Sequence, residues 1–164
     1  MPSIPKDPRE GGVDETDRRI LDAVTADARI TNSELAARIG VAPSTVHGRL
    51  RGLVERGVIA GFTTSVDQAR LGRGLQALVG VTLRPGSRQE SITEFAEHAH
   101  GFAQVIQVFF LGGADDFMVH VAVADSSALR RFVVEGISGH PRVASTRTNI
   151  IFDYHRSAVV ESFR

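Results

Sequence analysis

The segment TNSELAARIGVAPSTVHGRLRGLVERG, residues 31–57, predicts two short helices joined by a tight turn. Thr31 and Glu34 have the spacing of a capping box, which marks the beginning of a helix. Gly40 fits the left-handed position that ends this helix. Pro43 suits the first position of a second helix, and Gly57 is expected to end it.

The second of these helices separates apolar from polar side chains when its positions are drawn at about 100° per residue. Its core side is apolar, with Val46, Leu50, Leu53 and Val54. Its outward side carries short polar residues near the amino end, which are Ser44, Thr45 and His47. The candidates for contacts with backbone phosphates are four arginines in or near this helix, Arg38, Arg49, Arg51 and Arg56.

This distribution favours DNA binding over plain helix packing, which is the commoner reading of three short helices alone. A base-reading helix needs short polar side chains at its amino end to enter the major groove, with arginines beside them for the backbone. We therefore predict that the three polar side chains lie nearest bases and the four arginines nearest phosphates.

Composition sets wider limits on the protein. The 164 residues hold 19 basic and 19 acidic side chains, so the whole-chain charge indicates no nucleic acid, yet residues 38–57 carry four arginines against the single acid Glu55. The chain has no cysteine, which excludes disulfides and thiolate metal sites. No apolar run approaches the roughly 20 residues that span a bilayer. We expect a cytoplasmic protein without membrane association.

The flanking sequence predicts an α+β chain in five parts. A proline- and glycine-rich arm, 1–13, precedes a helix-turn-helix domain, 14–60, whose first helix is capped by Asp14. Val58 to Val66 has the pattern of an extended strand, and 61–74 is expected to be a linker strand and hinge. A ferredoxin-like βαββαβ domain, 75–154, and a tail, 155–164, follow. The strands of the ferredoxin-like domain are predicted at 75–83, 105–111, 117–124 and 143–154, and its helices at 87–98 and 126–137.

Both faces of the predicted sheet are substantially apolar. In the third strand, Val119 and Val121 alternate with Met118 and Ala122. Two helices cover only one face of such a sheet, and the other would be a large exposed apolar patch on a monomer. The sequence therefore predicts a symmetric dimer at least.

The chain resembles the leucine-responsive regulatory protein/AsnC (Lrp/AsnC) family of transcription regulators. The resemblance rests on DETDRRIL (14–21), residues 28–62, VDQARLG (66–72), GGADDFMVHV (112–121) and VASTRTNII (143–151). It implies a winged helix-turn-helix followed by an effector-binding domain that assembles dimers into tetramers or octamers. Ala42 replaces the family's usual serine cap, Gly52 a frequent arginine and Val54 a frequent glutamate, and these departures affect operator choice more than fold.

The resemblance also implies a pocket between dimers for a free amino acid. The implied residues are Leu111, Gly112, Gly113, Asp116, Thr146 and Thr148. Glycine backbone groups and threonine hydroxyls would bind the ligand, and Asp116 would face its ammonium group. No basic residue lies within the turn, so an apolar amino acid is expected, although Arg147 could turn toward the pocket. On sequence alone, residues 112–116 could equally form a plain hairpin loop.

Two other functions stay open at this point. Sirohaem decarboxylases are built from similar domains, and His120 and His155 are the candidates for such an enzyme. A nucleoid-type architectural protein would bind DNA with little sequence preference. The six histidines are scattered, so we expect no metal site and no cofactor other than the amino-acid effector.

Overall fold

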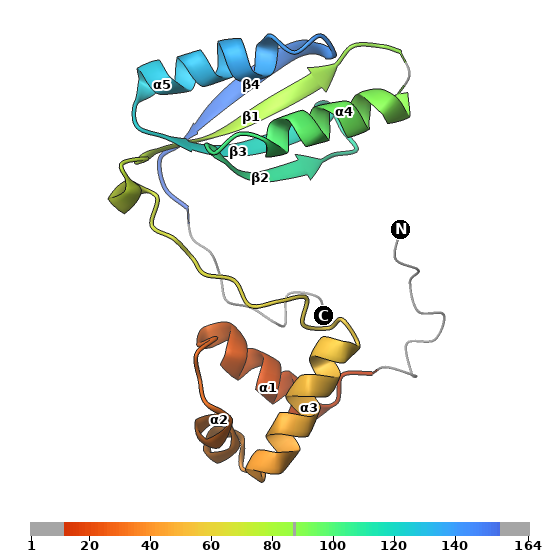
Figure 1. Ribbon diagram of the computed structural model, residues 1–164, viewed down its shortest axis with the longest axis vertical. Helices are drawn as coiled ribbons and strands as arrows, with labels where there is room; N and C mark the ends of the chain where they lie inside the picture. The colour runs from red at the N-terminus through yellow and green to blue at the C-terminus, as the bar shows by residue number, and fades with distance from the viewer. Residues whose placement is uncertain (1–11, 87, 155–164) are drawn as a thin grey trace. The chain divides into compact units, whose positions relative to one another are not determined.

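The computed structural model describes residues 12–86 and 88–154, which divide between two compact units at Thr64 and Ser65. The predicted arm and tail lie almost wholly outside these residues. The first unit contains three helices, α1 (Glu15–Ala26), α2 (Asn32–Ile39) and α3 (Pro43–Glu55). The three helices form the red-to-orange part of the chain in Figure 1, and they pack around an apolar core. The core side chains include Ile20, Leu35, Ile39, Val46 and Leu53.

Local signals fix the ends of these helices as the sequence predicts. The Asp17 amide donates to the Asp14 side chain at 2.8 Å and caps α1. The Thr31 amide donates to Glu34 at 2.9 Å, and the Glu34 amide donates back to the Thr31 hydroxyl at 3.2 Å, completing the capping box. Gly40 ends α2 with φ +73°, a left-handed conformation that glycine adopts without strain.

The strand predicted at 58–66 does not form, and this prediction is wrong, as is that of a linker strand within 61–74. The described chain has no strand between α3 and residue 75, and residues 60–67 are exposed. Ile59 alone packs on the first core, and its amide donates to the Leu53 carbonyl at 3.1 Å rather than to a neighbouring strand. Apolar alternation cannot make a strand without a partner for its backbone groups. The segment is an extended connector with one short 3₁₀ turn, η1 (Ala69–Leu71).

The second unit has the predicted ferredoxin-like order. Its elements are β1 (Leu75–Leu83), α4 (Arg88–His100), β2 (Val105–Phe110), β3 (Phe117–Val123), α5 (Ser126–Arg131), a π-helix η2 (Phe132–Ser138) and β4 (Val143–Ile151). The strands are antiparallel in the order β2-β3-β1-β4. Helices α4 and α5 lie against the same face of this sheet (Figure 1).

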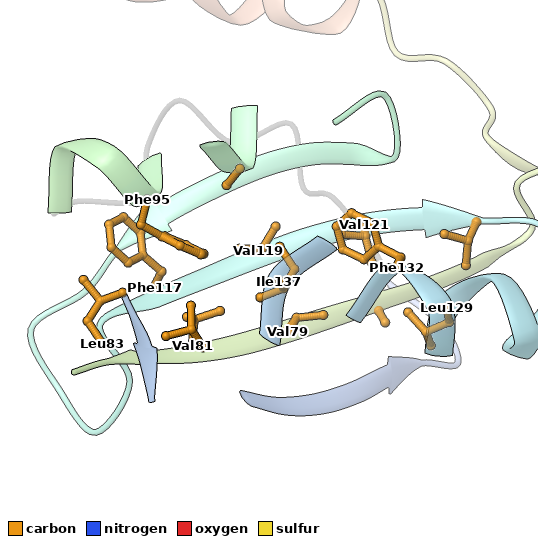
Figure 2. Packing of buried hydrophobic residues seen from close by; sticks show 14 residues of the cluster. Val79, Val81, Leu83, Phe95, Phe117, Val119, Val121, Leu129, Phe132 and Ile137 are labelled. Atoms are coloured by element: carbon orange, nitrogen blue, oxygen red, sulfur yellow. The ribbon is translucent and has the colours of Figure 1, made fainter. Parts of the chain in front are cut away.

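The core of the second unit fills the space between sheet and helices (Figure 2). Alternate side chains of β1 and β3 point into it, and Val79, Val81, Val119 and Val121 are fully buried. Phe95 of α4 packs on Phe117 with ring centroids 4.9 Å apart. Burying each such side chain stabilises the fold by about 1.5–3 kcal/mol.

Several boundaries differ from the predicted ones, by one to three residues. Helix α4 continues to His100, β4 ends at Ile151, and the helix capped by Asp125 changes to π geometry at Phe132. Within the π segment, Gly136 lies under the Phe102 ring, where a Cβ would come within 3.3 Å of two ring carbons. A Cβ at this position would make the Phe102 ring shift by a few tenths of an ångström.

Candidate DNA-binding and ligand-binding sites

The amino end of α3 presents the polar side chains that the sequence assigns to base reading. Ser44, Thr45 and His47 are exposed, whereas Val46 between them is fully buried. Pro43 fixes the first turn, and Ala42 offers no side-chain cap. The His47 ring lies 3.4 Å from the side-chain amide nitrogen of Asn32, the first residue of α2. The amino ends of α2 and α3 therefore lie close together.

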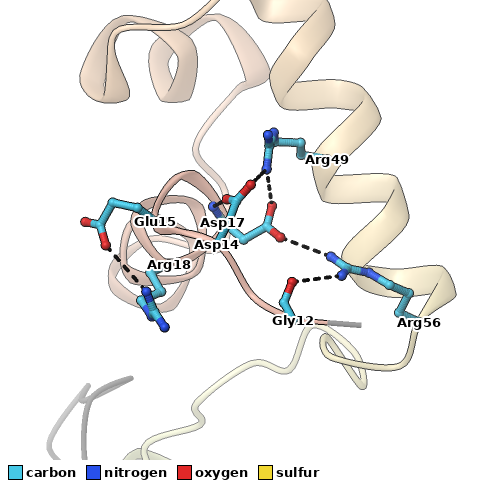
Figure 3. Close-up of polar contacts among 7 residues, drawn as sticks. All are labelled: Gly12, Asp14, Glu15, Asp17, Arg18, Arg49 and Arg56. Atoms are coloured by element: carbon cyan, nitrogen blue, oxygen red, sulfur yellow. Dashed lines mark hydrogen bonds and ion pairs between the residues drawn. The ribbon is translucent and has the colours of Figure 1, made fainter. Parts of the chain in front are cut away.

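Two of the four predicted phosphate arginines are engaged inside the unit (Figure 3). Arg49 donates to Asp14 and, at 3.0 Å, to the buried carboxylate of Asp17. Arg56 donates to the second oxygen of Asp17 at 3.1 Å. The hydrogen bond from Arg49 lowers the pKa of Asp14, and Asp14 in turn raises that of Arg49.

These ion pairs give Arg49 and Arg56 a structural role that the sequence analysis did not assign, and their contact with phosphates stays a prediction. Both lie on the flank of α3 that faces α1, and they position one helix on the other. The sequence held a signal for this arrangement, because α1 begins with the acids Asp14 and Asp17 and the helical phases place the two arginines on one flank. We call this four-residue cluster the α1–α3 clamp.

The other two arginines are accessible. Arg38 is exposed and forms no ion pair with any residue that the structure describes. Arg51 pairs with Glu55 one turn away at 2.7 Å, with 72% and 60% of the two side chains exposed. Exposed pairs of this kind contribute little to stability, so a phosphate can replace Glu55 at small cost.

In the second unit, the β2–β3 turn carries the glycines of the predicted effector site. Gly112 and Gly113 are exposed, and the Leu111 amide donates to the Asp116 carbonyl at 2.8 Å to close the hairpin. A Cβ at either glycine would meet no atom within 4 Å, so the turn is open to a ligand.

The Asp116 carboxylate does not face that opening, which corrects its predicted role with an ammonium group. It is buried and accepts hydrogen bonds from the Leu83 amide at 2.7 Å and from Arg88 at 2.5 Å. Arg88 and then the Leu83 amide lower the pKa of Asp116. Asp116 therefore ties the end of β1 to α4.

The neighbouring Asp115 is a residue that the sequence analysis missed. Its carboxylate lies over Gly80 of β1, where a Cβ would come within 2.6 Å of it. Arg147 of β4 donates to it at 2.6 Å. Only the three-dimensional pairing of Gly80 with Arg147 across β1 and β4 brings these residues together.

Thr146 and Thr148 lie on the other face of β4. They pair with Val81 and Val79, whose side chains point to the helices, and the Thr146 hydroxyl lies 2.9 Å from that of Ser138. Strand β1 separates β4 from β3 and its turn. Within one described chain the threonines and Gly112–Gly113 therefore do not form a single pocket.

Two histidines, His98 and His140, lie together with ring centroids 4.5 Å apart, but they belong to no cluster of metal ligands in the described residues. No group of three or more potential metal ligands occurs among the described residues. His120 bonds to Gln76 at 2.9 Å on the open face of the sheet, and His155 lies outside the described residues.

A three-helix unit with an exposed polar row on α3, joined to a ferredoxin-like unit, defines a class of proteins. These are the DNA-binding transcription regulators with a ligand-binding domain. The model of the winged helix-turn-helix DNA-binding domain matches residues 13–60, and that of the Lrp/AsnC ligand binding domain matches residues 76–160. The chain belongs to the Lrp/AsnC family of transcription regulators. It is a regulator and not an enzyme of the sirohaem decarboxylase type.

Curated relatives and solved structures agree with this assignment. The regulator AldR of Mycolicibacterium smegmatis is 49% identical over 96% of this chain and 91% of its own length. The crystal structure of MtbAldR is 40% identical, with a TM-score of 0.75 over 93% of this chain and 99% of its own. A regulator from Neisseria meningitidis in complex with L-methionine is 25% identical, with a TM-score of 0.83 over 89% of this chain and 95% of its own. Among the described residues, no helix has the length and apolarity to cross a membrane.

Proposed function

We propose that this regulator reads its operator with the amino end of α3 and that a free amino acid, bound to the second unit, changes its assembly or DNA affinity. The observation that carries the first part is the exposed polar row of Ser44, Thr45 and His47 beside a fully buried Val46. This row has the length and chemistry for base edges in the major groove. Arg38 and Arg51 lie outside the α1–α3 clamp and are the first candidates for phosphates, and such a regulator would act in the cytoplasm.

The second part of the proposal concerns assembly. The sheet face away from the helices carries Phe109, which is 44% exposed, beside the half-buried Met118 and Leu78. A second copy of the chain that covers this face would bury a continuous apolar surface. Dimers could then meet through their β2–β3 turns and form tetramers or octamers.

The amino-acid site is proposed at such a meeting of dimers. The open backbone of Leu111, Gly112 and Gly113 would bind the carboxylate, and Thr146 and Thr148 of a neighbouring copy would complete the pocket. The L-methionine complex of the Neisseria regulator supports an amino acid as the ligand class. An apolar side chain fits best because the two basic residues that contact the turn already have partners, Arg147 with Asp115 and Arg88 with Asp116.

The test combines ligand screening with DNA binding. A thermal-shift screen of the twenty amino acids should find a few, mainly apolar, that raise the melting temperature, because a ligand of the native state stabilises it by mass action. Fluorescence anisotropy should then show tighter binding to the operator than to random DNA, and an affinity that changes with the same amino acids. Equal affinity for both DNAs would indicate a nucleoid-type architectural protein, and a screen without any hit would contradict the effector.

A further inference from the structure

A cavity lies in the ligand-binding unit, away from the β2–β3 turn. Its volume is about 660 Å³, within the range of roughly 300–1,000 Å³ typical of small-molecule sites. It is bounded by the last residues of β3, by α5 and η2, by the chain after α4 and by Leu71–Arg73 of the connector. Since β3 begins at the turn and ends at the cavity, the two places lie at opposite ends of this strand.

The interior of this cavity is apolar. Val123 lines it with a buried side chain, and Phe102 packs edge-on against Phe132 with centroids 5.3 Å apart. Gly136 allows this packing, because any side chain there would crowd the Phe102 ring. The wall includes the π-helix η2, and π turns within helices are frequent at functional sites.

The rim of the cavity carries two opposite charges without a partner. Arg131 is the last residue of α5 and Glu135 lies in η2, and both side chains are exposed in the lining of the cavity. Within residues 12–86 and 88–154, neither side chain makes a hydrogen bond or ion pair. Arg73, also in the lining, donates to the Ala103 carbonyl at 2.6 Å and so holds the connector against the chain after α4.

We infer that this cavity is a separate binding site for a free α-amino acid with an apolar side chain. Arg131 binds the carboxylate, Glu135 binds the ammonium group, and the side chain enters the space between Phe102, Phe132 and Val123. This site is distinct from the effector pocket proposed at the turn, and neither pocket requires the other.

Calorimetry on the full chain tests this inference, with L-leucine, L-methionine and L-phenylalanine as probes. Arg131→Gln should weaken binding at this site at least tenfold, because it removes a charge-assisted contact. Arg130→Gln, at the adjacent exposed arginine outside the lining, is the matched control and should bind like the parent. Glu135→Gln should weaken binding of L-leucine but not of 4-methyl-2-oxopentanoate, which has no ammonium group.

The outcomes separate the two proposed pockets. If Arg131→Gln binds every probe like Arg130→Gln, the inference is overturned, and a loss with Thr148→Val alone would then support the turn pocket. If Arg131→Gln removes binding and Thr148→Val does not, the cavity is the amino-acid site and the turn pocket fails. If the 2-oxo acid binds the parent as tightly as L-leucine, the role of Glu135 and the amino-acid class are wrong.

Discussion

Asp116 joins the end of β1 to α4 through a buried carboxylate. Arg88 and then the Leu83 amide stabilise its charged form, so its folded pKa lies below the ordinary value of 3.8. A carboxylate with a depressed folded pKa contributes its full stabilisation above the unfolded value and loses it as the pH falls through the folded one.

We expect Asp116→Asn to lower the free energy of unfolding by about 1.5–3 kcal/mol at neutral pH, since it breaks hydrogen bonds to a buried charged group. As the pH falls below the ordinary value of 3.8 the difference from the parent should shrink, because the unfolded chain takes up the proton before the folded carboxylate does, and the difference is lost once the pH is below the folded pKa. Urea unfolding across this pH range measures both effects. Asp22→Asn, at an exposed position of α1, is the control, and a variant as stable as this control would contradict the role of Asp116.

Substitutions of His47 and Arg51 in α3 should affect DNA binding in two different ways. His47→Ala should change the discrimination between operators by about 1–3 kcal/mol for each base pair it contacts. Arg51→Ala should weaken binding to all sequences and reduce the salt slope by about one phosphate contact. Anisotropy titrations at several salt concentrations separate these effects. The assignment is wrong if both variants retain the parent's operator preference and salt slope.

At the scale of elements, the α1–α3 clamp sets how α3 lies on its support. Asp17 accepts from both Arg49 and Arg56, although its own carboxylate is buried. Removing one partner of such a cluster leaves charges unsatisfied at a helix interface, which costs more than an exposed pair would.

Asp17→Ala should therefore destabilise the first unit by about 2–3 kcal/mol and weaken DNA binding, although Asp17 itself is too buried to contact DNA. Circular dichroism during urea unfolding, together with anisotropy, measures both losses. Glu15→Ala removes an exposed partner of Arg18 on the same helix and is the matched control. Equal stability of the two variants would show that the clamp does not hold α3.

The elements that could be predicted are those with local signals. Asp14, Thr31 and Gly40 bound the first helices, and the alternation of Val119 and Val121 identifies β3 and its buried face. The strand at 58–66 failed because its alternation has no partner strand in the described chain. The contact of Asp115 with Gly80 and Arg147 was missed because two separate strands and a turn bring these residues together. Asp116 was misassigned because sequence spacing does not show that Leu83 and Arg88 occupy its carboxylate.

At the scale of the whole molecule, the exposed Phe109 on the sheet face opposite the helices predicts self-association. Phe109→Asp should convert the parent oligomer to smaller species, because it places a charge in the apolar surface that a second copy would cover. Light scattering measures the mass. Val134→Asp alters a 54% exposed apolar residue of η2, on the helix side, and should leave the mass unchanged. A parent that is monomeric at micromolar concentration would contradict the dimer.

The α1–α3 clamp also bears on how such a regulator can diverge. The side chains that hold α3 in place, Arg49 and Arg56, are different from those that face outward at its amino end. Substitution at positions 44, 45 and 47 can therefore direct the protein to new promoters while the ion pairs that hold α3 on α1 stay intact. After gene duplication, two copies could acquire separate sets of target genes without passing through an unfolded intermediate.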